Sequence, residues 1–216
     1  MAFGEVGTSL SKIKANSLNL AGTYGFSGTV SGLADETPLV LISTFTSDGS
    51  DATASFTSGI DSTYKEYLFV FNNIHPENNA TRLQYNLSVD GGSNYNVAKT
   101  TTSFKAYHDE GDSGTGLIYE TGTDLAQGTG TQYIGDDISN ANDSCMSGKM
   151  ILYNPSSTTF VKQILIQTAT LANGNYAVFN TTGTGYANTT SAINAVQFSM
   201  SSGEIQGGTI DMFGVV

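Results

Sequence analysis

The chain has 216 residues, a formal net charge of −11 and a single arginine, Arg82. This length suits one all-β domain, or one domain with an arm, and 38% hydrophobic residues are enough to form a substantial core. The acidic balance leaves no basic footprint for nucleic acid and disfavours anionic membranes. The single cysteine, Cys145, excludes an intrachain disulfide, and no stretch approaches the roughly 20 apolar residues of a membrane-spanning helix.

The first 34 residues differ in composition from the rest of the chain. The stretch 17–32, SLNLAGTYGFSGTVSG, is rich in Gly, Ser and Thr and carries too few apolar residues to fold alone. We expect residues 1–34 to form an extended arm, laid on a neighbouring subunit or wound with two further copies, or else a disordered tail. The first residues contain no apolar h-region, so no secretory signal is predicted. Residues 35–216 form the predicted β-sandwich domain.

The stretch 67–92 is the centre of the predicted domain. It begins with a near-continuous apolar run, YLFVF at 67–71, which favours a strand covered on both faces. At 83–89 apolar and polar residues alternate strictly, which predicts a strand with one buried face and one wet face. Asp90, Gly91 and Gly92 then supply the positive φ angles that a tight hairpin turn needs.

The rest of the domain shows strand patterns separated by turn-forming residues. A bulge is expected near Ala195, where the apolar alternation changes phase. The only helix-like pattern is short, at 10–15. These features predict an all-β fold, an antiparallel, jelly-roll-like β-sandwich with an extended N-terminal arm. The further predicted strands are 39–45, 52–57, 94–108, 117–119, 149–154, 160–170, 176–179, 192–200 and 208–216.

Several strings in the sequence form a distinctive set. They are FTSGIDSTYKEYLFVFNNIHP, LSVDGGSNYN, KTTTSFKAYH, YNPSSTTF and TTSAINAVQFSMSSGEIQGGTIDMFGV. Together they resemble a recurrent domain in virion proteins of tailed bacteriophages, notably marine ones. The resemblance implies a β-sandwich carried on fibres, spikes or decorations, usually as a homotrimer with a structural or attachment role. The chain is shorter than long tail fibres, which leaves room for a capsid decoration or a short tail appendage.

No motif for catalysis, phosphate binding or a structural metal is present. His75 precedes a proline in a predicted turn, and nothing in the spacing of Cys145 and His108 requires a nucleophilic dyad. We therefore predict no catalytic residue, no metal site and no cofactor. The single cysteine is expected to be a small apolar filler.

Acidic residues cluster in two predicted loops. Asp109, Glu110 and Asp112 lie in the first, while Asp136 and Asp137 lie in a second, longer loop. The length of the second loop is typical of functional or mobile segments. Paired carboxylates occur in glycoside hydrolases, and carboxylate oxygens also bind Ca²⁺, although no EF-hand spacing is present. Solvated loop charges are the simpler expectation.

Aromatic residues flank the first of these acidic loops. Tyr107 and His108 precede the loop, and Tyr119 follows it. Sugar-binding sites stack pyranose rings on aromatic side chains, although tyrosine in a strand is more often part of a core. The candidate ligand-binding residues are therefore Tyr107, His108 and Asp109.

The function predicted from the sequence is that of a non-enzymatic structural protein of a bacteriophage particle. It would be a tail fibre, spike or capsid decoration, docked by its N-terminal arm and displaying the β-sandwich for host attachment. The expected partners are two further copies in a homotrimer, other capsid or tail proteins, and a host surface glycan, with no nucleic acid and no membrane insertion. We expect synthesis in the host cytoplasm and release within the virion by lysis. Two alternatives remain open: a carbohydrate-binding module for host glycans, and a polysaccharide depolymerase.

Overall fold

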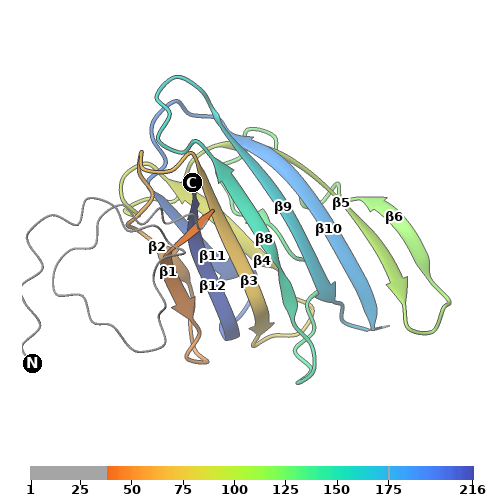
Figure 1. Cartoon of the computed structure of the whole chain (residues 1–216). Helices are drawn as coiled ribbons and strands as arrows, with labels where there is room; N and C mark the ends of the chain where they lie inside the picture. The colour runs from red at the N-terminus through yellow and green to blue at the C-terminus, as the bar shows by residue number, and fades with distance from the viewer. Residues whose placement is uncertain (1–37, 175) are drawn as a thin grey trace, which may run out of the picture. The chain divides into compact units, whose positions relative to one another are not determined.

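The computed structural model describes residues 38–174 and 176–216. Within these residues the chain forms twelve β-strands and no helix, and the strands build two antiparallel sheets that pack together (Figure 1). The predicted β-sandwich is thereby confirmed. The arm expected over 1–34 and the helix-like pattern at 10–15 lie outside the described residues.

The two sheets differ in size, and the larger sheet therefore extends beyond the smaller one. Figure 1 shows β5 and β6 at the end of the larger sheet that is opposite to β1. The larger sheet has eight strands in the order β1 (Leu39–Thr46), β12 (Ile205–Val215), β3 (Glu66–Pro76), β8 (Met146–Tyr153), β9 (Lys162–Leu171), β10 (Ala177–Ala187), β5 (Lys99–Asp109) and β6 (Thr115–Tyr119). The smaller sheet has four strands in the order β2 (Ala54–Phe56), β11 (Ala195–Met200), β4 (Leu83–Ser88) and β7 (Gln132–Tyr133).

Aromatic side chains form the centre of the core between the sheets. Phe198 of β11 packs edge to face on Phe69 and Phe71 of β3, with ring centroids 5.4 and 5.2 Å apart. Phe56 of β2 completes the cluster, at 5.4 Å from Phe69 and 6.1 Å from Phe198. All of these side chains are buried. Because each such pair contributes about 0.5–1.5 kcal/mol beyond its buried area, the cluster stabilises the packing of one sheet on the other.

Strand β3 follows the sequence prediction only in part. Tyr67, Phe69 and Phe71 face the core, and they alternate with Leu68 and Val70, which are half-buried on the opposite face. Within residues 38–174 and 176–216 the smaller sheet covers only one of the two faces, so the expected cover of the second face is not found among the described residues.

Three predictions are wrong. The turn at Gly91 and Gly92 has positive φ angles, as expected, but it closes no hairpin, because β4 lies in the smaller sheet and β5 in the larger one. The predicted strand 176–179 is too short, because the Gly- and Thr-rich stretch after it also belongs to β10, whose pairing with β5 and β9 is continuous. The pairing of β11 with β4 is regular from Ala195 onward, so the expected bulge is not found there.

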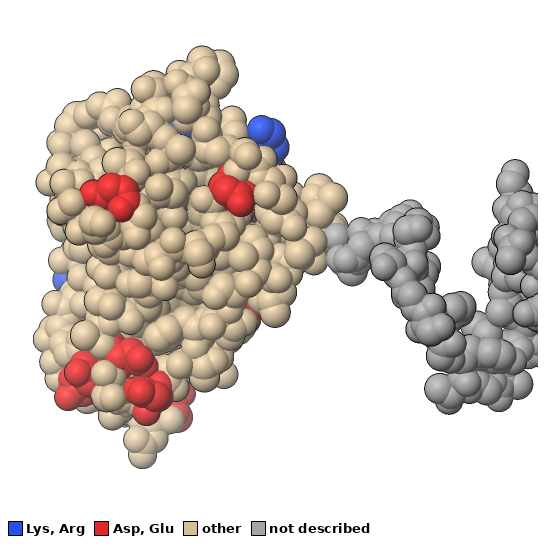
Figure 2. All heavy atoms as spheres, turned by 90° about the vertical axis from the view of Figure 1, so that its left-hand side faces the viewer, with Lys and Arg blue, Asp and Glu red and all other residues tan. Residues whose placement is uncertain are grey.

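Charged side chains are sparse on the surface, as the composition requires, since only 12% of the residues are charged. Figure 2 shows the β1 side of the sandwich, where a few clusters of acidic groups interrupt a mostly uncharged surface. No helix within the described ranges is long and apolar enough to cross a membrane.

Candidate ligand-binding site

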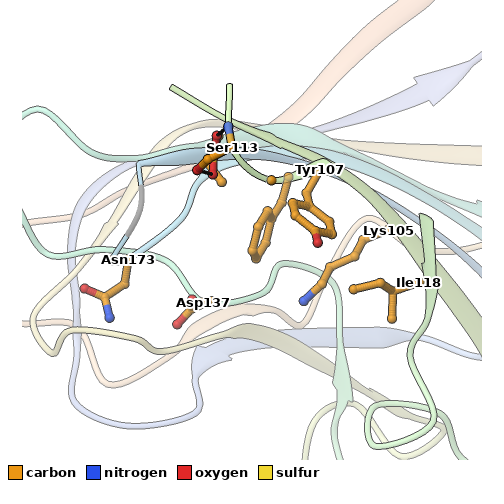
Figure 3. Close-up of a pocket in the computed structure, with 11 residues that line it drawn as sticks. Lys105, Tyr107, Ser113, Ile118, Asp137 and Asn173 are labelled. Atoms are coloured by element: carbon orange, nitrogen blue, oxygen red, sulfur yellow. Dashed lines mark hydrogen bonds between the residues drawn. The ribbon is translucent and has the colours of Figure 1, made fainter. Parts of the chain in front are cut away.

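A cavity of about 480 Å³ lies at the end of the sandwich where the larger sheet extends beyond the smaller one. Its walls come from inward-facing side chains of β10, β5 and β6, from the β5–β6 turn, and from loop residues beyond these strands (Figure 3). The lining residues are Lys105, Tyr107, Asp109, Ser113, Gly114, Ile118, Asp137, Asn173, Gly174, Ala177 and Phe179.

Two aromatic rings form one wall of the cavity. Tyr107 of β5 pairs directly with Phe179 of β10, and the two rings meet edge to face with centroids 6.0 Å apart. On the β6 side the Tyr107 ring lies against Gly116, where a Cβ atom would come within 2.7 Å of the ring. Glycine at this position therefore makes room for the ring, and the tyrosine is held between its two neighbouring strands. Ile118, the β6 partner of Lys105, adds an apolar surface.

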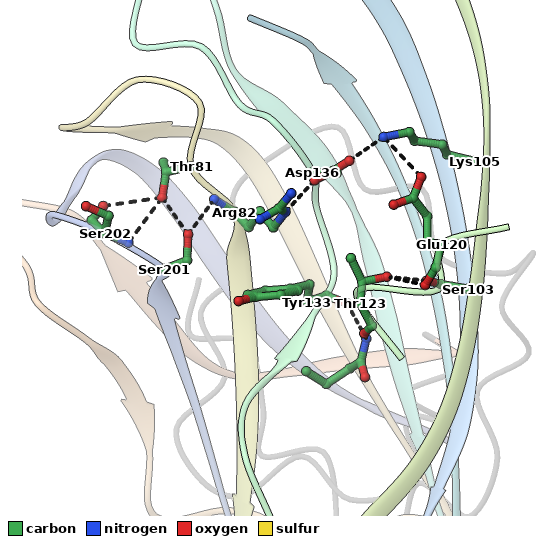
Figure 4. Close-up of polar contacts among 11 residues, drawn as sticks. Thr81, Arg82, Ser103, Lys105, Glu120, Thr123, Tyr133, Asp136, Ser201 and Ser202 are labelled. Atoms are coloured by element: carbon green, nitrogen blue, oxygen red, sulfur yellow. Dashed lines mark hydrogen bonds and ion pairs between the residues drawn. The ribbon is translucent and has the colours of Figure 1, made fainter. Parts of the chain in front are cut away.

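An ion-pair network lies beside this wall (Figure 4). Lys105 of β5 contacts the carboxylates of Asp136 and Glu120, the latter at 3.1 Å. Arg82, which precedes β4, binds the other oxygen of Asp136 at 2.5 Å. The Lys105 ammonium also lies 4.4 Å from the centroid of the Phe179 ring, a cation–π contact. The network thus links the β4 side of the smaller sheet to the larger sheet and holds Lys105 against the aromatic wall.

The network gives two neighbouring carboxyl groups opposite pKa shifts. Burial alone would raise the pKa of Asp136, but hydrogen bonds from Lys105 and Arg82 outweigh burial and hold that pKa below its usual value. Burial, together with the adjacent charge of Asp136, raises the pKa of Asp137. Asp137 lines the cavity, whereas Asp136 faces the two cations. The cavity therefore contains a carboxyl group that is a weaker acid than an ordinary aspartate.

The loop that carries Asp137 is held by backbone and side-chain contacts. Asp137 has a positive φ of 51°, and its carbonyl oxygen accepts a 2.8 Å hydrogen bond from the backbone N–H of Asn173. The next residue, Ile138, is fully buried, and its N–H donates to the carbonyl of Thr81 at 2.7 Å. The side-chain amide of Asn173 is oriented by Asn79, whose Nδ2 donates to Asn173 Oδ1 at 2.8 Å. The backbone of Asp137 and the side chain of Asn173, from different loops, are thus held in place at the cavity.

Asp109 shapes the rim of the cavity. Its Oδ1 accepts the backbone N–H of Ser113 at 2.8 Å, and its Oδ2 accepts the Ser113 hydroxyl at 2.7 Å. These hydrogen bonds lower the pKa of Asp109. The Asp109 N–H donates to the carbonyl of Gly114 at 3.0 Å, which closes the turn between β5 and β6. The carboxylate therefore orders the turn that forms one edge of the site.

The structure places the three predicted ligand-binding residues on two different faces. Tyr107 and Asp109 line the cavity, whereas His108 lies on the opposite face of the sheet and contacts Asp112 at 3.0 Å. The reason is the alternation of side chains along a strand, which sends neighbouring residues to opposite faces. The same alternation brings Lys105 to the cavity, a residue that the sequence analysis did not select.

Other candidates from the sequence come together only in part. Asp109 and Asp137, from the two acidic loops, share the cavity, whereas Glu110 is exposed to solvent. Cys145 and His108, which were considered as a dyad, are each hydrogen-bonded to another residue. Cys145 donates to Asn73, and His108 contacts Asp112 in the β5–β6 turn. Among residues 38–174 and 176–216, no group of three or more His, Cys, Asp or Glu side chains could hold a metal ion.

No family model, no curated protein and no solved structure matches the chain. A functional proposal therefore depends on the sequence and on the geometry of the cavity.

Proposed function

We propose that this chain is a non-enzymatic structural protein of a bacteriophage particle, a fibre, spike or decoration whose β-sandwich attaches the particle to a saccharide of the host surface. The virion setting is supported by the sequence strings that resemble phage appendage domains. The attachment role is supported by one observation above all, a cavity in which aromatic rings and fixed polar groups face the same space.

The chemistry of the cavity suits a sugar ring. Its volume of about 480 Å³ lies within the range of about 300–1,000 Å³ that is typical of small-molecule sites. A pyranose has C–H faces that pack on aromatic rings, and it has hydroxyl groups that need hydrogen-bond partners. Tyr107 and Phe179 provide the apolar surface, while Asp137 and Asn173 provide polar partners at the other side.

The charges at the cavity favour neutral or amino-bearing sugars over acidic ones. Among the described residues Lys105 is the only cation that lines the cavity, and its charge is already balanced by Asp136 and Glu120. Asp109 and Asp137 add negative charge to the lining. An acidic sugar would meet this negative charge with the lysine already paired, so its binding is disfavoured.

Binding is favoured over hydrolysis by the role of Asp109. Hydrolysis by two carboxyl groups needs a second group that acts on water or on the sugar, in addition to the acid. Both carboxylate oxygens of Asp109 already accept hydrogen bonds from Ser113. This carboxylate therefore supports the turn, and Asp137 is the remaining acidic side chain of the lining.

The experiment that tests the attachment role is a glycan array probed with the full chain, followed by titration calorimetry with any glycan that binds. Tyr107→Ala removes one ring and is expected to lower the affinity about tenfold, which corresponds to roughly 1.4 kcal/mol. His108→Ala is the matched control, since the neighbouring side chain faces away, and it should bind as the wild type does. Equal losses in both variants, or no binding to any glycan, would contradict the attachment role.

The virion setting needs a separate measurement. Immunogold electron microscopy of intact phage particles, with antibodies against this chain, is expected to label the tail or the capsid surface. Particles that carry no label, while the lysate contains the free protein, would remove the virion part of the proposal and leave the saccharide site untouched.

A second candidate, a polysaccharide depolymerase, is favoured by one carboxyl group of the cavity. Burial raises the pKa of Asp137, as it does for the general acids of glycosidases. Release of reducing sugar from a host polysaccharide, lost in Asp137→Asn while glycan binding persists, would establish this candidate. Retained binding without any turnover would eliminate it.

A further inference from the structure

We propose that the outer face of the larger sheet is an interface between two copies of this chain, related by a two-fold axis that runs along β3. The outer face is the one opposite to the smaller sheet. This interface is independent of the saccharide site, because that site lies on the inner face of the same sheet, at the β5 end.

A row of apolar side chains crosses the outer face. Directly paired residues of neighbouring strands carry the row from the β1 edge past the middle of the sheet. At the two ends of the row, Leu41 is 57% exposed and Leu165 is 45% exposed. A contiguous apolar surface of this kind is typical of an interaction site. In the strand order β1, β12, β3, β8 and β9, the row consists of Leu41, Phe213, Leu68, Ile151 and Leu165.

The sequence of β3 indicates that this outer face is covered. A strand that is wet on one face alternates apolar and polar residues, whereas a strand that is apolar on both faces is typical of one covered on both sides. In β3 the outer residues Leu68 and Val70 are as apolar as the inner residues Tyr67, Phe69 and Phe71. Among the described residues only the smaller sheet packs on β3, and it covers the inner face. A partner on the outer face therefore accounts for the apolar run.

The arrangement of the row is self-complementary. Leu68 lies at its centre, with Phe213 and Ile151 on either side. A two-fold axis along β3 therefore superposes the row on the row of a second copy. Leu68 meets its own equivalent, and Phe213 of one copy meets Ile151 of the other. Leu41 of one copy likewise meets Leu165 of the other.

The same axis pairs opposite charges. In the next row along β3, Asp211 of β12 and Lys149 of β8 lie on either side of Val70. The axis brings Asp211 of one copy opposite Lys149 of the other, and the symmetry produces this pair twice. Asp211 is held in place by the Thr44 hydroxyl, which donates to it at 2.6 Å, and by the Asn72 amide at 3.3 Å. This charge complementarity indicates that the partner covering the outer face is a second copy, related by this axis.

The outer face also contains a hollow that suits a leucine side chain. The hollow has a volume of about 450 Å³ and lies over β8, β9 and β10. Ile151 and Leu165 line it, together with the outward-facing residues Thr182 and Thr184 of β10. Under the two-fold axis, Leu41 of the second copy lies at this hollow because it meets Leu165. The exposed end of the row in one copy therefore packs into a depression of the other.

The area is sufficient for a stable dimer. The five strands have 8 to 11 residues, so they are about 33 Å long on average, while five neighbouring strands span about 24 Å in the other direction. The resulting footprint of roughly 800 Å² per copy matches the ~800 Å² per partner of a standard protein interface.

The test is the mass of the full chain in solution, measured by sedimentation equilibrium at micromolar concentrations. The wild type is expected to be a dimer, in place of the homotrimer that the sequence resemblance implies. Leu41→Glu and Leu165→Glu should each raise the dimer dissociation constant at least a hundredfold, with an unchanged far-UV circular dichroism spectrum. The matched control is Leu117→Glu on β6, because Leu117 is 72% exposed but lies outside the row. This control should remain a dimer.

A charge exchange distinguishes a broken interface from a damaged fold. Lys149→Asp and Asp211→Lys should each weaken the dimer, and the double variant should restore it. A monomeric wild type would overturn the proposal, as would a trimer that persists in Leu165→Glu. It would also be overturned by an equal loss of association in Leu117→Glu, or by a double variant that is no better than either single one.

Discussion

Replacement of Asp136 by asparagine tests whether the ion-pair network holds the cavity together. The side chain of Asp136 is 7% exposed, and its partners Lys105 and Arg82 are 12% and 40% exposed. The Arg82 pair is partly solvated, so its loss should cost about 0.5–1 kcal/mol. Removal of one charge from a desolvated ion pair costs roughly 3–5 kcal/mol. Loss of the pair between Asp136 and Lys105 should cost less than this, because Glu120 still contacts the lysine. We therefore expect Asp136→Asn to lower the free energy of unfolding by about 3 kcal/mol.

Urea denaturation followed by circular dichroism measures this loss, with Asp112→Asn as the matched control. Asp112 pairs with His108 on the exposed surface, so its replacement should cost less than about 0.5 kcal/mol. Because Lys105 also contacts the Phe179 ring, Asp136→Asn should weaken saccharide binding as well. Equal unfolding midpoints for the two variants would refute the inference that this network stabilises the site.

Three further outcomes follow from the same geometry. The pKa of Asp136 is lower in the folded chain than its ordinary value of 3.8. The ionised carboxylate therefore contributes its full share of the folding stability above pH 3.8, and this share is lost as the pH falls through the folded pKa. The free energy of unfolding, measured by urea denaturation, should thus fall more steeply with acid for the wild type than for Asp136→Asn. Burial lowers the pKa of Lys99 to about 8, against 10.5 in the unfolded chain, so the unfolded state binds the extra proton between these two pH values. The free energy of unfolding, measured by urea denaturation, should therefore rise between pH 8 and 10.5 by about 1–3 kcal/mol relative to Lys99→Met. Gly116→Ala places a Cβ atom 2.7 Å from the Tyr107 ring and should lower saccharide affinity several-fold by calorimetry, whereas Gly122→Ala, with no atom near its Cβ, should leave the affinity unchanged.

The alternation of apolar and polar residues predicted most strands of the sandwich. It failed where pairing with neighbouring strands, and not the local sequence, determines whether a segment is a strand. In β9 the apolar run of Ile164, Leu165 and Ile166, with a glutamine on each side, predicts the strand correctly. In β10 the residues around Gly183 and Gly185 are turn formers by composition, yet they form a strand. β10 pairs with β9 on one edge and β5 on the other, and hydrogen bonding on both edges outweighs a weak local propensity.

The candidate site was predictable only along a single strand. Tyr107 and Asp109 follow from the sequence of β5, and the period of two also predicts that Lys105 shares their face and that His108 does not. Phe179 reaches the site because β10 is the neighbour of β5 in the sheet, which is a property of the strand order. Asp137 reaches it through a loop held by the backbone of Asn173. Neither contact has a local sequence signal, because both join segments that are distant along the chain.

The saccharide site is tested by a crystal structure of the full chain with the best-binding saccharide from the array. We expect a sugar ring packed against Tyr107 and Phe179, with its hydroxyl groups within hydrogen-bond distance of Asp137 or Asn173. A saccharide bound elsewhere on the sandwich, with the cavity between β10, β5 and β6 left empty, would rule out this site.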